Sequence, residues 1–163
     1  MIHFVRHGES QANVDHVFAG ISHPAPLTER GRQQARLAGQ RILDADIRID
    51  QIVSSPLERA YDTSAIIAGC LGLDPSGILL DARLIEYDVG GLSGESTHEV
   101  TAAQLVGAPG AEDPAVFQNR VKVELESYLN GHVIELGDEN AEHGTVRNDG
   151  FDLLFLPAVV IRG

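Results

Sequence analysis

The stretch Ile2-His3-Phe4-Val5-Arg6-His7-Gly8-Glu9-Ser10 decides how this sequence is interpreted. Its first part is a short apolar run with a β-branched bias, which predicts a central strand over residues 2–5. An imidazole next to a guanidinium and a glycine, at the exit of a strand, is suited to attack on phosphorus. His7 would be the nucleophile and Arg6 would hold the phosphoryl oxygens. Gly8 would let the backbone approach the ligand without a Cβ in the way.

Two further motifs support this interpretation, Pro26-Leu27-Thr28-Glu29-Arg30-Gly31 and Ser54-Ser55-Pro56-Leu57-Glu58-Arg59-Ala60. Thr28 is a typical N-cap, and the apolar spacing after it predicts a helix to about Ala45. Residues 51–55 are typical of a second strand, and a helix is expected from about 57 to 71. Arg59 lies near the start of that helix, and its planar fork matches phosphate oxygens in a way that lysine could not. The alternative is an arginine on the helix surface.

Together, in this order and spacing, the three motifs resemble the histidine phosphatase superfamily, also called the phosphoglycerate mutase-like family. The resemblance is strong over residues 1–95 and poor after them. It implies a phosphohistidine intermediate at His7, a hydrogen-bonding role for Asn13 and a glycine near the substrate at Gly20. For Asn13 a role in a loop turn is the alternative.

The segment Arg83-Leu84-Ile85-Glu86, followed by Gly90-Gly91-Leu92-Ser93-Gly94, resembles the part of this family in which a glutamate protonates the leaving oxygen. The resemblance therefore implies that Glu86 is the proton donor, which requires its pKa to be raised by burial beside an anionic ligand. The alternative is a structural carboxylate that pairs with Arg83 or with an active-site arginine.

The rest of the chain continues the alternation of strand and helix. Strands are expected at residues 78–80, 132–136 and 153–161, and the clearest late helix is expected from Glu112 to about Leu129. Its apolar positions would be Val116, Val121, Leu125 and Leu129. This order predicts an α/β fold, and the resemblance implies a phosphoglycerate mutase-like three-layer sandwich. Its mainly parallel central sheet would carry helices on both faces. Ligands of such sheets lie at the carboxyl ends of the strands, where the residues after both early strands would converge.

The family carries a second histidine in a Ser-His-Gly-like motif after a strongly apolar strand, and no such stretch follows residue 95. His143 is followed by a glycine but preceded by polar residues, and His132 lies on a strand-like run without the motif. We keep both as candidates and favour the absence of a second histidine. The other four histidines are expected to be structural or on the surface: His3, His16, His23 and His98. Of these, His23 lies in a loop that could approach the site. The C-terminal part of the fold is accordingly expected to be shortened.

Composition narrows the class of protein. The chain has 163 residues, a charged fraction of 22% and a net charge of −12. Residues 1–83 hold 8 Lys and Arg against 10 Asp and Glu, and residues 84–163 hold 4 against 14. Such an acidic surface argues against nucleic-acid binding, because that needs basic patches. No apolar run is long enough to cross a membrane. We expect one domain over residues 1–163, atypical or incomplete after about residue 130.

A cytoplasmic protein without intramolecular disulfides is expected, because Cys70 is the single cysteine and no secretory signal is visible. No grouping of side chains has the spacing of metal ligands, and no Gly-rich nucleotide loop occurs, so neither a metal nor a cofactor is expected. The partner expected is phosphate or a small phosphorylated metabolite. The oligomeric state stays open.

Three classes of function remain compatible with the sequence. The first is a metal-independent phosphomonoesterase that works through His7; transfer of the phosphoryl group as in a phosphoglycerate mutase is a variant that the short chain disfavours. The second is a non-catalytic module that binds a phosphorylated ligand. The third is a truncated or rearranged product whose last strands pack imperfectly.

Overall fold

The structure is a computed structural model that describes residues 2–128, 133–135 and 159–162. Its described strands form one five-stranded sheet in the order β3-β2-β5-β1-β4. They are β1 (Ile2–Val5), β2 (Gln51–Ser54), β3 (Leu79–Leu80), β4 (Val133–Glu135) and β5 (Val159–Arg162). β1 pairs in parallel with β4, and β2 with β3, whereas β5 runs antiparallel between β1 and β2. Four of the five strands therefore share one direction, and the expected α/β architecture with a mainly parallel sheet is confirmed.

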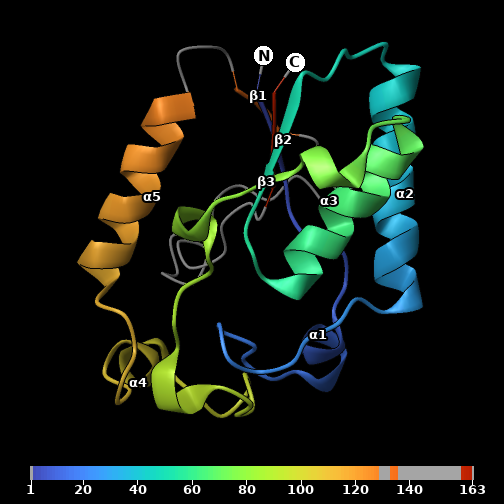
Figure 1. Ribbon diagram of the computed structural model, residues 1–163. Coiled ribbons are helices and arrows are strands. Elements are labelled where there is room, and N and C mark those ends of the chain that lie inside the picture. The colour runs from blue at the N-terminus through green and yellow to red at the C-terminus, as the bar shows by residue number, and fades with distance from the viewer. Residues whose placement is uncertain (1, 129–132, 136–158, 163) are drawn as a thin grey trace.

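Helices lie on both sides of this sheet, as Figure 1 shows, with α2 and α3 on one side and α5 on the other. The α-helices are α1 (Gln11–Asp15), α2 (Glu29–Asp44), α3 (Glu58–Cys70), α4 (Ala102–Val106) and α5 (Pro114–Tyr128). Short 3-10 turns are η1 (Pro75–Gly77), η2 (Ala82–Leu84) and η3 (Gly90–Leu92). Of the helices that the structure describes, none is long and apolar enough to cross a membrane.

The helices α2 and α3 begin and end close to where the sequence predicts. The Thr28 hydroxyl accepts a hydrogen bond from the Gly31 N–H at 3.0 Å, so Thr28 is the N-cap of α2. After α3, Gly72 has a φ of +70°, a conformation that favours glycine and ends the helix. The short helices α1 and α4 were not predicted, because five residues carry too little periodicity to be recognised.

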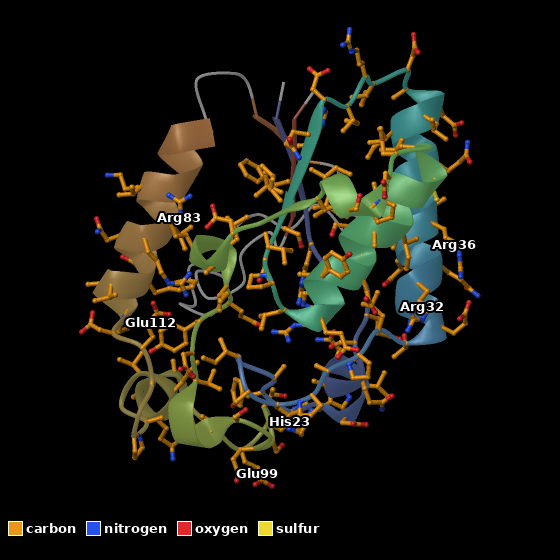
Figure 2. The ribbon with its side chains drawn as sticks, in the orientation of Figure 1. His23, Arg32, Arg36, Arg83, Glu99 and Glu112 are labelled. Carbon is orange, nitrogen blue, oxygen red and sulfur yellow. The ribbon has the colours of Figure 1, made fainter. Side chains whose placement is uncertain are left out.

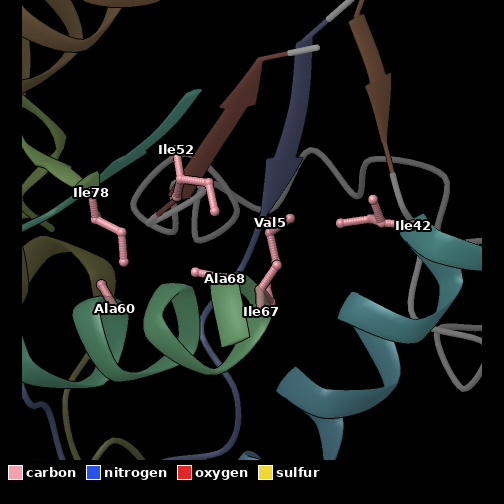
Figure 3. Packing of buried hydrophobic residues seen from close by; sticks show 7 residues of the cluster. All are labelled: Val5, Ile42, Ile52, Ala60, Ile67, Ala68 and Ile78. Atoms are coloured by element: carbon pink, nitrogen blue, oxygen red, sulfur yellow. The ribbon is translucent and has the colours of Figure 1, made fainter. Parts of the chain in front are cut away.

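The main core lies between the sheet and the pair α2 and α3. Its buried members include Val5 of β1, Ile52 of β2, Ile42 of α2 and Ile67 of α3, and Figure 3 shows them together with Ala60, Ala68 and Ile78. Burial of an isoleucine side chain stabilises the fold by about 1.5–3 kcal/mol. This packing holds the ends of β1 and β2, and with them the start of α3, in a fixed relation.

A second apolar cluster connects α5 with the segment that contains Glu86. Phe117 and Val121, one helical turn apart on α5, pack with Tyr87, Val89 and other buried residues. The predicted inward face of this helix is partly wrong, because Val116 is 59% exposed and Phe117 takes the inner position. The helix begins at Pro114 with an orientation that tertiary packing selects, whereas Leu125 and Leu129 lie outside the residues whose side chains are described.

Candidate active site

The predicted site residues converge on one cavity of about 180 Å³. Six of them line it: Arg6, His7, Asn13, Gly20, Arg59 and Glu86. Arg6 and His7 follow β1, and Arg59 is the second residue of the helix after β2. Because these two strands share a direction, their carboxyl ends meet at the same edge of the sheet, as the sequence predicts. The remaining wall is mostly apolar and includes Val17, Phe18, Val89 and Leu105.

His7 is a neutral imidazole, and one of its nitrogens is engaged in a hydrogen bond. Its Nδ1 lies 2.7 Å from the carbonyl oxygen of Gly8, and since a carbonyl only accepts, Nδ1 carries the proton. The lone pair is then on Nε2. Burial lowers the pKa of His7 from 6.5 to about 4, and the positive charges of Arg59 and Arg6 add to that effect, while the Gly8 carbonyl opposes it. At neutral pH the ring is therefore available as a nucleophile.

The lowered pKa of His7 makes a prediction that NMR can check in the unliganded protein. The ring signals of His7 should titrate near pH 4 rather than near 6.5, because desolvation and two guanidinium groups disfavour the imidazolium. The His7 ring therefore stays neutral and nucleophilic as the pH is lowered from 7, and it becomes protonated and loses its nucleophilicity as the pH falls through about 4. His7→Ala assigns the signal, and circular dichroism checks that the protein stays folded. A midpoint near 6.5 would contradict the described environment.

Arg59 and Glu86, which both line the cavity, form an ion pair between a buried guanidinium and a partly buried carboxylate. The Arg59 side chain is only 5% exposed and pairs through Nη2 with the Glu86 carboxylate. The same nitrogen donates to the carbonyl oxygen of Gly20 at 2.9 Å. Arg83 does not take this place, because its guanidinium pairs with Asp81, with Nη2 and Oδ2 2.8 Å apart. Arg59 thus lies inside the site instead of on the helix surface, and of the two pairings left open for Glu86, the active-site arginine is the one formed.

Comparison with known proteins identifies the family of this chain. The family model described as "Histidine phosphatase superfamily (branch 1)" matches residues 2–132. The chain belongs to this superfamily. The matched region extends well past residue 95, where the motifs of the sequence analysis end.

The relatives of this chain within the superfamily include proteins named as mutases and proteins named as phosphatases. A "Probable phosphoglycerate mutase GpmB" of Salmonella choleraesuis is 36% identical in an alignment of 140 positions that covers 78% of this chain and 62% of that protein. The chain thus spans about three fifths of the length of this relative. An α-ribazole phosphatase from Shigella flexneri is 27% identical, with a TM-score of 0.63 over 83% of this chain and 72% of that one. Bacillus stearothermophilus YhfR is 26% identical, with a TM-score of 0.65 over 82% and 70%.

Gly8 of the superfamily motif has a packing task in this structure. Among the described residues it is not part of the cavity lining, and a Cβ on it would overlap the Gly31 carbonyl of α2. A Cβ on Gly31 would in turn overlap the backbone of Glu9. Two glycines therefore let the loop after β1 lie directly against the start of α2. The Gly8 N–H donates to the Thr63 hydroxyl at 3.1 Å, so this N–H already has a hydrogen-bond partner within the protein.

Two residues in or beside the site were not predicted from the sequence, Ser10 and Thr63. Thr63, which accepts from Gly8, also donates to the Arg59 carbonyl at 2.7 Å and so ties the loop after β1 to α3. Ser10 is buried and lines the cavity. Its N–H and hydroxyl both donate to Asn13 Oδ1 at 2.9 Å, so Asn13 takes the turn role that was left open while it also lines the cavity. A Ser-x-x-Asn capping pattern before a short helix was the available signal.

Among the described histidines outside the motif, His16 departs from expectation, whereas the buried His3 and the exposed His98 agree with it. His16 lines the cavity, and its ring lies 4.9 Å from that of His98 between centroids. His23, labelled in Figure 2, is not among the described lining residues and lies against Gly94 instead. His3 is fully buried in β1. His132 and His143, the two candidates for the superfamily's second histidine, lie outside the described residues.

Proposed function

We propose that this protein hydrolyses a small phosphomonoester without a metal, through a phosphohistidine at His7. The observation that carries the proposal is the hydrogen bond between Nδ1 and the Gly8 carbonyl, which leaves the Nε2 lone pair on a ring that lines a cavity with two guanidinium groups. Arg6 and Arg59 supply the positive charge that a phosphoryl group spreads over its equatorial oxygens. Catalysis then rests on positioning and electrostatics.

The reaction has two steps that share the same groups. Nε2 of His7 attacks phosphorus and the bond to the leaving oxygen breaks, while Glu86 gives that oxygen a proton. Water then attacks the phosphohistidine, Glu86 takes a proton back, and phosphate leaves. In the unliganded protein Glu86 is paired with Arg59. We propose that an incoming phosphoryl group competes for Arg59, and that the released Glu86 carboxylate then takes up a proton, from solvent or from the phosphomonoester monoanion, which it gives to the leaving oxygen in the first step.

Phosphoryl transfer to a second hydroxyl is the main alternative, supported by the relative named as a phosphoglycerate mutase at 36% identity. It uses the same phosphohistidine and differs only in the acceptor of the second step. Hydrolysis is favoured by the similarity to a solved α-ribazole phosphatase at 27% identity. A phospholigand-binding module is the second alternative, because two arginines hold phosphate whether or not turnover follows.

Hydrolysis of p-nitrophenyl phosphate tests the proposal. We expect saturable release of phosphate that is unchanged by EDTA, because guanidinium groups supply the charge that a metal would otherwise supply. A control with added Mg²⁺ should give the same rate. Binding of vanadate without any turnover would favour the binding module, and loss of activity in EDTA would contradict the metal-independent route.

The same assay bears on the second histidine. Because the sequence favours its absence, His143→Ala should change the rate little, and turnover should be slow while phosphate binding stays measurable. A large loss in a folded His143→Ala protein would instead assign His143 to the phosphoryl group.

A further inference from the structure

A single guanidinium on α5 holds the backbone that carries Glu86. Arg120 Nη1 donates to the carbonyl oxygens of Arg83 at 2.8 Å and Ile85 at 2.7 Å, and Nη2 donates to that of Glu86 at 3.3 Å. Nε and Nη2 donate to the two carboxylate oxygens of Glu112 at 2.7 and 2.8 Å. A guanidinium has five N–H donors, and these five bonds use all of them.

The backbone of Glu112, whose carboxylate pairs with Arg120, is bound to the residues that follow Glu86. The Glu112 N–H donates to the Asp88 carbonyl at 2.8 Å, and the Tyr87 hydroxyl donates to the Glu112 carbonyl. The Arg120 guanidinium also lies over the Phe117 ring, 4.8 Å from its centroid. Figure 2 shows Arg83 and Glu112 close to α5. Residues 83–88 are therefore bound on both sides of Glu86, to Arg120 of α5 and to the backbone of Glu112, which lies just before that helix.

Glu86 connects these contacts of Arg120 with the cavity. The backbone of Glu86 is bound to Arg120, whereas its carboxylate is paired with Arg59 inside the site. A change in the carbonyl directions of residues 83–86 would move the carboxylate relative to the phosphoryl group. Proton transfer is sensitive to such displacements, because donor and acceptor must come within hydrogen-bond reach.

We infer that Arg120 is a positioning residue for proton delivery by Glu86, an inference that rests on the proposed function. Arg120 is not among the described residues that line the cavity, and it acts through the three carbonyl groups and the backbone to which they belong. A lysine keeps the charge but offers three donors from a single nitrogen, so it cannot serve three carbonyls and a bidentate carboxylate together.

The leaving group distinguishes this role from general stability. An aryl phosphate such as p-nitrophenyl phosphate releases a weakly basic phenolate that hardly needs a proton, whereas glycerol phosphate releases a strongly basic alkoxide. General acid catalysis contributes about 10²–10⁴-fold where it is needed. Dephosphorylation is common to both substrates, so the comparison uses kcat/KM, which reports only the steps up to release of the leaving group. Arg120→Lys should therefore lower kcat/KM for glycerol phosphate about tenfold or more and kcat/KM for the aryl ester about threefold at most.

The experiment compares the wild type and four folded variants on both substrates. Glu86→Gln should show the same substrate pattern as Arg120→Lys with a larger loss. In the double variant, Arg120→Lys should add almost nothing, because the group it positions is gone. Arg36→Lys is the matched control, since Arg36 makes an exposed ion pair with Glu29 on α2 at 3.2 Å, and it should leave both rates unchanged.

Several outcomes overturn the inference. Equal losses on the two substrates would give Arg120 a structural role only, and so would full additivity with Glu86→Gln. If Arg120→Lys does not fold, Glu112→Gln serves as the second variant, because it loosens the fork while the three carbonyl bonds stay; it should show the same pattern with a smaller effect. Absence of any wild-type turnover would overturn the proposed function itself, and the inference with it.

Discussion

His7→Ala is expected to lose phosphatase activity by about 10³-fold or more, because removal of a nucleophile leaves only binding and charge stabilisation to act on the substrate. The loss should fall on kcat, since Arg6 and Arg59 still line the cavity and hold the phosphoryl group. The measurement is steady-state hydrolysis of p-nitrophenyl phosphate, with the inhibition constant of phosphate measured on the same protein.

Chemical trapping gives this prediction a second readout. A phosphodonor should label the wild-type protein with an acid-labile, base-stable adduct, as expected for phosphohistidine, and should leave His7→Ala unlabelled. The matched control is His23→Ala, because His23 lies near the site in sequence but does not line the described cavity. More than a few per cent residual activity in a folded His7→Ala protein would remove His7 from the role of nucleophile.

The sequence could predict the convergence of the site because strand exits carry positional information. Arg6 and His7 follow one apolar run and Arg59 follows the next, and strands that share a direction bring such residues to one edge. The pairing of Glu86 with Arg59 could be named only as one of two options. Both depend on where the path of residues 81–86 places the two side chains; in the fold Arg83 pairs with Asp81, and Glu86 pairs with Arg59.

Close backbone approach was harder to foresee. Gly8 was assigned to the ligand because glycine permits approach of any kind, and the sequence does not say which neighbour comes close. In the fold that neighbour is Gly31, from the second motif. The motif that begins at Pro26 thus has a physical reason: the Thr28 N–H and the Glu9 carbonyl are joined at 2.9 Å, and the loop after β1 is fixed to α2.

Long-range side-chain contacts lay beyond sequence reasoning altogether. Arg120 is a single arginine in a helix pattern, and nothing near it in sequence shows that its donors meet carbonyls about 35 residues earlier. The same holds for His16, whose place in the cavity follows from a left-handed backbone with a φ of 52° at the end of α1. The antiparallel direction of β5 is likewise a property of the whole sheet, because apolar runs do not encode strand polarity.

Arg59→Lys is expected to weaken binding of vanadate and phosphate tenfold or more while the net charge of the site stays the same. The arginine is buried, and its fork can give a phosphoryl group two parallel bonds, each charge-assisted and worth about 1.5–3 kcal/mol. A lysine presents one nitrogen and loses at least one of these bonds. The loss of affinity therefore measures the contribution of the two-bond geometry of the guanidinium, because the lysine keeps the positive charge.

The inhibition constant of vanadate decides this prediction, measured against the aryl ester for the wild type, Arg59→Lys and the remote control Arg36→Lys. The control should match the wild type, since Arg36 is exposed on α2 and paired with Glu29. Thermal unfolding of each variant separates lost binding from lost folding. An unchanged inhibition constant in a folded Arg59→Lys protein would mean that the guanidinium stays on Glu86 and the Gly20 carbonyl when the ligand is bound. The phosphoryl group would then depend on Arg6 for its charge, and the release of Glu86 by competition for Arg59 would have to be abandoned.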